Sequence, residues 1–160
     1  MLDSSTAKTH QHAMGAKGGK EVHAIAKSRG GNGTKIHALV DALGYPIDIL
    51  LTGANVHDSV PATNFINGKH SEYFIGDKAY DSNAIREAVL QSGAEAVIPS
   101  QGNRAHIFNY DKHIYKERHL VECFFQRIKS WRRIATRYEK TIDMFKGMVH
   151  IACILIWLMF

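Results

Sequence analysis

The chain of 160 residues is long enough for one domain with a sizeable core, and its apolar and charged content is that of a globular protein. Its net charge of +5 is unevenly spread, because residues 41–111 hold nine of the 15 acidic residues but only four of the 20 lysines and arginines. Basic ends favour nucleic acid as a partner, with a solvated basic surface as the alternative. The chain has only two cysteines, which is too few for a disulfide framework. The N-terminus lacks the apolar core of a signal peptide, and the apolar run HIACILIWLMF is too short to span a bilayer. We therefore expect no membrane contact and a reducing compartment.

The first third of the chain predicts a strand, a basic loop and a hairpin. The stretch LDSSTAKTHQ is typical of a short strand with Asp3 near its beginning, and residues 11–33, rich in Gly, Lys and His, are typical of a loop. Two apolar runs, TKIHALVDALG and YPIDILLTG, predict antiparallel strands joined by a turn at residues 44–46.

Helices and strands alternate after the hairpin. VHDSVPATNFING predicts a short helix with Asp58 or Ser59 as its N-cap, and EYFIGDKAY predicts a strand that ends at Asp77. DSNAIREAVLQSG then predicts a helix that is capped by Asp81 or Ser82.

The remaining segments complete an α/β fold. EAVIP is a short strand, residues 100–113 form a polar loop, and two helices follow, over residues 112–130 and from Thr141 onward. An early antiparallel hairpin followed by alternating helix and strand predicts a mixed sheet flanked by helices. A right-handed crossover is expected to join the strand before Asp77 to EAVIP.

Four polar residues of YKERHLVECFFQRIKS fall on one side of its predicted helix. Each residue of an α-helix is rotated by about 100° about the helix axis. If Arg118 is set at zero, Tyr115 lies at about 60°, Glu122 at about 40° and Lys129 at about 20° around this axis. The apolar residues fill a separate arc. Glu122 is then either a carboxylate on the rim of a basic groove or the partner of Arg118 in a solvated i,i+4 ion pair.

Three carboxylates stand where they could converge: Asp3 on the first strand, Asp77 at the end of a strand, and Glu122 on the helix. Side chains at the ends of central strands usually face a crevice, and carboxylates that meet there repel one another unless a cation joins them. Hard oxygen ligands suit Mg²⁺ or Mn²⁺, and two such ions about 4 Å apart can promote cleavage of a phosphodiester. Each acid also has an ordinary alternative, as a turn residue, a turn cap or an ion-pair partner.

The spacing Y-x2-R-x3-E-x6-K, from Tyr115 through Arg118 and Glu122 to Lys129, resembles the signature of bacterial insertion-sequence DDE transposases, specifically the insertion-sequence-5 family. Other stretches resemble successive blocks of the catalytic domain of that family: LDSSTAKTH, GGNGTKIHALVDALG, ANVHDS, IGDKAYDS, VIPSQGNR and YKERHLVECFFQRIKSWRRIATRY. The resemblance covers nearly the whole chain.

This resemblance implies a ribonuclease H-like fold and a transposase catalytic domain over residues 1–160, which cleaves DNA and transfers strands to move an insertion sequence. It implies that Asp3, Asp77 and Glu122 are catalytic and hold Mg²⁺ or Mn²⁺, as two ions. The signature residues Tyr115, Arg118 and Lys129 are implied to orient Glu122 and to contact phosphates. The implied partner is DNA, as element ends and target, and the implied location is the bacterial cytoplasm.

The chain departs from the family pattern at its start. Because Asp3 comes almost at once, we expect a first strand clipped to two residues before Asp3, and no N-terminal region that binds element ends. An upstream-frame DNA-binding region and a second copy of the chain are then further candidate partners. Three hypotheses compete: an active transposase domain, an inactive remnant that only binds DNA non-specifically, and a ribonuclease H-like nuclease with another substrate.

Other basic residues are weaker candidates for DNA contact. Lys35, Lys78 and Arg104 are predicted to lie beside the sheet ends, where they could meet the DNA backbone. The run of Arg132, Arg133 and Arg137 has phosphate contact and a solvated face as equal alternatives.

Overall fold

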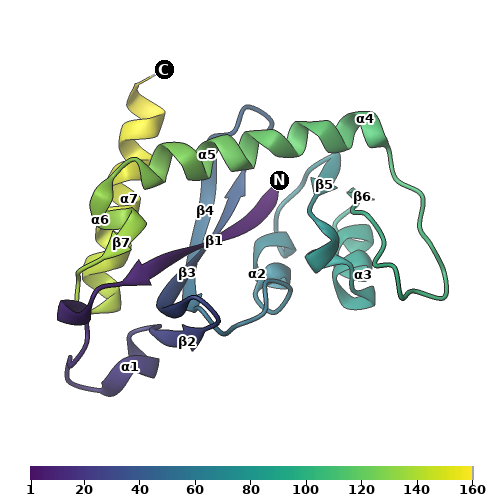
Figure 1. The fold of residues 1–160 in the computed structure, drawn as a ribbon. Helices are drawn as coiled ribbons and strands as arrows, with labels where there is room; N and C mark the ends of the chain where they lie inside the picture. The colour runs from purple at the N-terminus through teal and green to yellow at the C-terminus, as the bar shows by residue number, and fades with distance from the viewer. Residues whose placement is uncertain (160) are drawn as a thin grey trace.

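The computed structural model describes residues 1–159 and shows a mixed α/β fold built around a five-stranded sheet (Figure 1). Strand β1 (Leu2–Thr9) pairs antiparallel with β3 (Gly31–Val40) along most of its length, and its last residues pair parallel with β7 (Thr136–Arg137). The opposite edge of β3 pairs with β2 (Ala26–Ser28) and then with β4 (Pro46–Gly53). The first strand, predicted from LDSSTAKTHQ, therefore lies inside the sheet, between β3 and β7.

The hairpin of β3 and β4 confirms the sequence prediction, and its turn has a clear local cause. One carboxylate oxygen of Asp41 accepts hydrogen bonds from the backbone amides of Leu43 and Tyr45, both at 2.9 Å. Gly44 adopts φ = 84°, a left-handed conformation that glycine takes at little cost. The turn is therefore stabilised by its own residues, and Pro46 begins the second strand directly after it.

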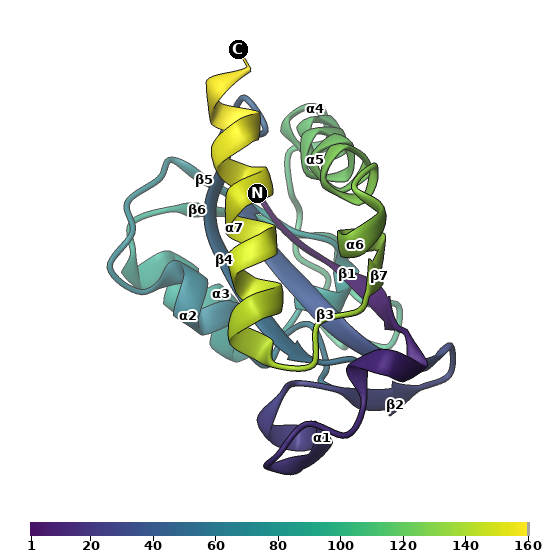
Figure 2. The ribbon, with the colours of Figure 1, turned by 90° about the vertical axis from the view of Figure 1, so that its left-hand side faces the viewer.

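Helices cover both faces of the sheet and bury two separate cores (Figure 2). On one face lie α5 (His119–Lys129), α6 (Arg132–Ala135) and α7 (Ile142–Leu158). On the other face lie α2 (Ala62–Ile66) and α3 (Asn83–Gln91). Alternation along β1 serves both cores, because Leu2 packs with α2 and α3, whereas Ala7 packs with the core beneath α5.

A second, two-stranded sheet is formed by β5 (Tyr73–Ile75) and β6 (Glu95–Val97). The two strands are parallel and α3 connects them, as the alternation of helix and strand predicts. They form a sheet of their own and not the far edge of one continuous mixed sheet, which corrects the sequence prediction. Ile75 packs in one core and Phe74 in the other, so β5 contributes to both of the cores described above.

Several boundaries differ from the prediction. Residues 11–33, expected as a loop, contain a 3₁₀ turn (Gln11–Ala13), α1 (Gly19–Val22) and β2. The predicted helix over 112–130 is divided into α4 (Lys112–Tyr115), a 3₁₀ turn (Lys116–Arg118) and α5. The short segments α6 and β7 were not predicted, because segments this short lack a detectable hydrophobic period.

The N-caps were predicted with mixed success. Ser82 caps α3 by accepting the Ile85 amide at 3.2 Å, which confirms one of the two expected caps. The cap predicted for α2 is wrong, because the N-cap residue is Pro61 and it makes no side-chain hydrogen bond. The Asp58 carboxylate, expected as that cap, accepts hydrogen bonds from Ser4 and Lys35 instead.

The interpretation of Arg137 as part of an exposed basic run is wrong. Arg137 is fully buried. Its guanidinium donates hydrogen bonds to the His23 carbonyl at 2.7 Å, the Thr34 hydroxyl at 2.6 Å and the Glu139 carbonyl at 2.9 Å. A buried cation needs such acceptors to offset the loss of water. Arg137 is therefore a structural residue that ties the end of β7 to β3 and to the segment before β2.

Helix α7 packs its central residues into the core, in agreement with the prediction of a buried terminal helix. Its outer face stays exposed at Met144, Ile151, Ile154 and Leu158. Within residues 1–159, no helix has the length and apolar content that crossing a membrane requires.

A buried histidine makes stability depend on pH. His37 on β3 is fully buried, and burial lowers its pKa from 6.5 to about 4, although the charge of Asp58 opposes this shift. As pH falls from 6.5 toward about 4, the unfolded chain therefore binds a proton that the folded chain does not, and stability falls by about 3 kcal/mol.

We expect His37→Gln to remove most of this loss, since glutamine can still bond to Thr52 but does not titrate. The measurement is urea unfolding of both proteins at pH 7 and pH 4.5, with exposed His119→Gln as the control. An equal loss of stability in wild type and His37→Gln would contradict the prediction.

Candidate active site

The site begins with the stripe of polar residues on the helices α4 and α5. Arg118 ends the 3₁₀ turn between them, and Glu122 lies in the first turn of α5. The apolar side of α5 is buried through Val121, Phe124 and Ile128, so the polar side faces outward along the edge of β1. This arrangement follows from helical spacing, as the sequence predicts.

Arg118 joins two carboxylates that are far apart in the chain. One nitrogen of its guanidinium donates to Asp3 Oδ2 at 2.9 Å, and the other forms an ion pair with Glu122. The i,i+4 ion pair that the sequence allows is thus present, but Asp3 is a second partner, from the first strand. A planar guanidinium suits this role because its fork presents several donors in fixed directions.

Asp3 sits in a partly buried position where ionisation is disfavoured. Burial raises the pKa of Asp3 above its ordinary value, the charge of Asp77 adds to this, and the Ser4 amide and Arg118 oppose it. The Ser4 amide donates to Asp3 Oδ1 at 2.8 Å. No hydrogen bond joins Asp3 to Asp77 among the described residues.

Asp77 is held by the turn that follows β5. Its Oδ1 accepts the Ala79 amide at 2.8 Å, so Asp77 is the N-cap of a 3₁₀ turn (Lys78–Tyr80). Asp77 was predicted to end the strand, and it lies two residues after Ile75, the last residue of β5.

A cleft of about 430 Å³ opens between β1 and α5. Its lining residues are Asp3, Ser4, Ser5, Glu122, Phe125, Gln126 and Lys129. Lys129 donates to the Ser5 hydroxyl at 2.5 Å and to the Thr6 carbonyl at 3.0 Å, and burial lowers the pKa of its ammonium. The cleft thus has acidic groups at one end and a desolvated cation at the other.

The three carboxylates fit a divalent cation by their chemistry, but Arg118 stands between two of them. Among residues 1–159, no three His, Cys, Asp or Glu side chains are close enough together to hold a metal ion as they stand. The donor set is nevertheless all carboxylate oxygen, which is the set that Mg²⁺ and Mn²⁺ prefer. The Arg118 guanidinium neutralises Asp3 and Glu122 by an ion pair with each of them.

The other residues predicted to contact DNA differ in their exposure and in whether they pair within the protein. Lys78 is exposed on the turn after Asp77, and Tyr115 lies beside Arg118, partly buried. Lys35 forms an ion pair with Asp58 at 2.7 Å, and its side chain is only 14% exposed.

Arg104 is engaged with the protein itself. It donates to the buried Asp81 carboxylate at 2.7 Å and to Asn83 at 2.8 Å. Arg86 binds the other oxygen of Asp81 at 2.8 Å, and both guanidinium groups lie over the ring of Phe108. Arg104 therefore fastens the loop over 100–111 to α3, and this structural role leaves little of the side chain for a ligand.

Sequence reasoning missed the residues behind Asp3. On the opposite face of β1, Ser4 donates its hydroxyl to Asp58 at 2.7 Å, and Asp58 also binds Lys35. Burial raises the pKa of Asp58, but the hydrogen bonds from Lys35 and Ser4 prevail and lower it. The only available signal was the proximity of Asp58 to a proline, which suggested a helix cap and not a contact between distant segments.

Comparisons with known proteins identify the family of the chain. The family model described as "Transposase DDE domain" matches residues 1–157. A candidate transposase for insertion sequence element IS6501 from Brucella ovis is 42% identical over 127 residues, which are 78% of this chain and 98% of that protein. A candidate transposase for insertion sequence element IS402 from Burkholderia cepacia is 28% identical over 136 residues, covering 78% of this chain and 62% of that protein. No solved structure matches the chain significantly.

Proposed function

We propose, since this chain belongs to the transposase DDE domain family, that it cleaves phosphodiester bonds and transfers strands to move an insertion sequence of the insertion-sequence-5 type. The observation that carries the proposal is the Arg118 bridge, which brings Asp3 of β1 and Glu122 of α5 to one guanidinium. Asp77 supplies a third carboxylate, whose charge contributes to the raised pKa of Asp3. Two acids from distant segments therefore share one cleft, and Asp77, which does not line it, is proposed as the third ligand.

The fold supports a ribonuclease H-like assignment. The sheet is mixed, it begins with an antiparallel strand pair and hairpin, and helices cover both of its faces (Figure 2). The acids come from the first strand, the turn after β5 and the helix that crosses the sheet. Catalytic groups of α/β proteins gather in this way at strand ends, where loops and helices meet.

Asp3, Asp77 and Glu122 would hold Mg²⁺ or Mn²⁺, as two ions. When bound, these ions supply charge stabilisation for the attacking and leaving oxygens of an in-line displacement. The three carboxylates supply the oxygen ligands, and Arg118, once released from Asp3, is free to bind a phosphate through two parallel hydrogen bonds. No protein nucleophile is required, because water or a DNA 3′-hydroxyl attacks phosphorus.

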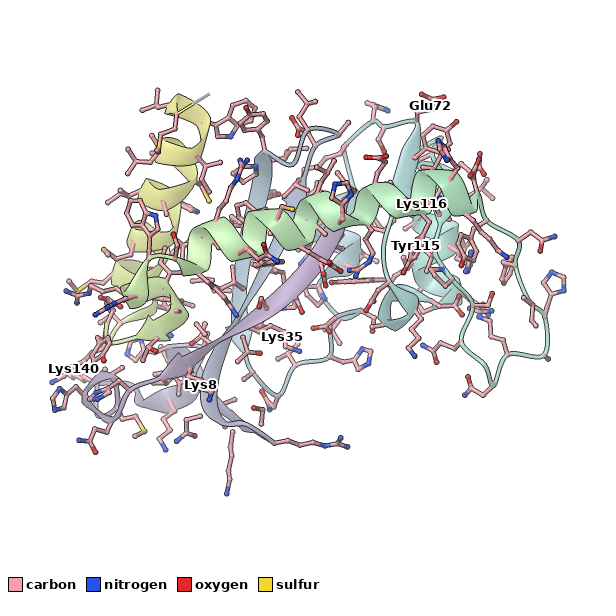
Figure 3. All side chains as sticks on the ribbon, turned by 45° about the horizontal axis from the view of Figure 1, so that its top comes forward. Lys8, Lys35, Glu72, Tyr115, Lys116 and Lys140 are labelled. Carbon is pink, nitrogen blue, oxygen red and sulfur yellow. The ribbon has the colours of Figure 1, made fainter. Side chains whose placement is uncertain are left out.

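Basic side chains lie on both sides of the proposed centre. Figure 3 shows Tyr115 and Lys116 toward the right of the view, and Lys8, near the end of β1, and Lys140 toward the left. Lys129 already contacts the backbone of β1. A duplex laid along β1 would meet cations throughout, and such contacts hold phosphates without reading sequence.

One observation favours the alternative of an inactive remnant that only binds DNA non-specifically. Arg118 fills the position between Asp3 and Glu122, and the described residues contain no ready-made metal site. A ribonuclease H-like nuclease with another substrate is the third possibility. Metal-dependent cleavage separates the remnant from both enzymes, and strand joining separates the transposase from the nuclease.

The test is a joining assay with a labelled oligonucleotide that ends in a 3′-hydroxyl and a supercoiled plasmid as target. We expect joined product with Mn²⁺ or Mg²⁺ and none with EDTA. We also expect DNA binding to weaken steeply between 50 and 200 mM salt, by roughly a hundredfold or more if several phosphates are contacted. Binding without any metal-dependent product would support the remnant, whereas nicking without joining would support the nuclease.

A further inference from the structure

A hollow of about 700 Å³, here called the slot, lies between the two sheets, where the N-terminus stands beside β5 (Figures 1 and 2). Its walls come from the end of β3, from α2, β5 and α4, and from Met1. The slot shares no lining residue with the cleft between β1 and α5. It is therefore a second site, separate from the candidate active site.

The walls of the slot belong to both cores of the protein. Val40 and Ile75 line it from the core beneath α5, whereas Leu39 and Phe74 line it from the core beneath α2 and α3. An occupant of the slot would thus meet apolar side chains of both layers. A β-strand suits such a place, because its successive side chains point to opposite faces.

Strand β5 turns an open edge away from β6. The Glu72 carbonyl accepts a hydrogen bond from Glu95 at 2.9 Å, and the Gly76 amide donates to Val97 at 3.3 Å. Because backbone groups of successive residues point to opposite edges of a strand, Tyr73 and Ile75 turn theirs to the other edge. No described strand pairs there, since β5 pairs with β6 alone. An open edge of this kind is a template for a further strand.

The nitrogen of Met1 is already placed as part of a strand. It donates to the Val40 carbonyl at 2.7 Å, and the Val40 amide donates to the Met1 carbonyl at 2.8 Å. This pair continues the register in which Leu2 lies opposite Leu39. Burial lowers the pKa of the Met1 amine from 8.0 to about 6, although the charge of Asp41 opposes the shift. A charged amine is therefore disfavoured where the N–H of a peptide bond would make the same hydrogen bond without a charge.

We propose that the slot is the docking site of one extended apolar strand, which is joined to the nitrogen of Met1, continues β1 and pairs with the open edge of β5. The edge spans three residues, Tyr73–Ile75, so about four added residues suffice at a rise of about 3.3 Å each. Their side chains alternate between the two cores, so successive positions are apolar, as in strands that are covered on both faces.

The docked strand would join the two sheets into one and fix β1 against β5. Asp3 lies two residues after Met1, and Asp77 lies two residues after Ile75. Docking would therefore also fix these two proposed ligands relative to each other, in a protein whose described residues contain no ready-made metal site. This effect on the metal centre rests on the proposed function, whereas the docking itself does not.

The experiment compares the 160-residue chain with three versions that carry four added residues before Met1: Val-Ile-Val-Ile, Val-Pro-Val-Pro and Gly-Ser-Gly-Ser. Because the Met1 nitrogen faces Val40, alternation turns the amides of the two added isoleucines toward β5. Proline at these positions keeps apolar character but cannot donate a hydrogen bond. The Gly-Ser version adds the same length without apolar side chains.

The measurements are amide hydrogen exchange and melting, both in EDTA. We expect the Val-Ile-Val-Ile version to slow exchange at Tyr73 and Ile75 by roughly tenfold, since one hydrogen bond there becomes protected. We also expect its melting temperature to rise by about 3 °C or more. The two control versions are expected to match the unextended chain, and the Thr136 amide on β7 is the internal reference.

Unchanged exchange at Tyr73 and Ile75 in the Val-Ile-Val-Ile version would overturn the docking site. Equal protection by all three extensions would overturn it as well, and so would protection that sedimentation finds only in a dimer. Mn²⁺ calorimetry on the same proteins separates this inference from the proposed function. Protection in versions that bind no Mn²⁺ would uphold the docked strand and count against the metal centre.

Discussion

Replacing Asp77 by Asn is expected to abolish metal-dependent strand joining while leaving the fold intact. Asparagine removes one charged ligand, and losing about 4 kcal/mol of transition-state stabilisation slows the reaction by about 10³-fold. The side-chain oxygen of asparagine can still accept the Ala79 amide, so the cap of the 3₁₀ turn survives. This substitution therefore separates the chemistry of Asp77 from its structural role, which Asp77→Ala would not do.

The measurement combines the joining assay with melting curves in EDTA and in Mn²⁺. Wild type should melt at a higher temperature with Mn²⁺, since a ligand that binds only the folded state stabilises it, and Asp77→Asn should lose most of this gain. Asp48→Asn is the matched control, because Asp48 pairs with Lys69 and does not line the cleft. An Asp77→Asn protein that joined DNA at the wild-type rate would exclude Asp77 as a ligand.

Replacing Arg118 by Ala is expected to change metal binding and catalysis in opposite directions. The Arg118 guanidinium pairs with Asp3 and Glu122, the same carboxylates that are proposed to bind a cation. Without it, the carboxylates are uncompensated, and Mn²⁺ should bind about fivefold more tightly, which corresponds to about 1 kcal/mol for a partly exposed ion pair. Joining should nevertheless fall by about 10²-fold, because a donor to the reacting phosphate is lost.

The two effects are measured on one preparation, by Mn²⁺ calorimetry and by the joining assay. Lys146→Ala is the control, since Lys146 on α7 is exposed and forms no ion pair within the described residues. Weaker Mn²⁺ binding by Arg118→Ala would show that the guanidinium supports the metal centre and does not compete for it.

The local parts of the fold were readable from the sequence because their causes are local. The β3–β4 hairpin depends on Asp41 and Gly44, and α3 depends on Ser82, all within a few residues of the elements they shape. The short strands β2 and β7 could not be read, since they are held by pairing with other segments. Arg137 shows the same limit, because it follows the basic pair Arg132 and Arg133 closely in the sequence and only the fold reveals its buried acceptors.

The candidate site was readable only in part for the same reason. Helical spacing places Arg118 beside Glu122, and the resemblance to transposases points to Asp3 and Asp77. No local pattern shows that Arg118 would hold Asp3 across 115 positions of sequence. Asp58 was misread as a helix cap because proximity to a proline was weighed, whereas its partner on β1 lies 54 positions away.

The pairing of β1 with β3 has a consequence for insertions and deletions. Seven successive residue pairs, from Leu2 opposite Leu39 to Lys8 opposite Gly33, fix which side chains face α5. A slip of one position would turn Ser4 toward Arg118 and Asp3 toward Asp58, exchanging the two faces of the strand. Gaining or losing a single residue within β1 is therefore more damaging than exchanging exposed residues such as Thr6 or Lys8, since it misaligns the acid while leaving every residue type in place.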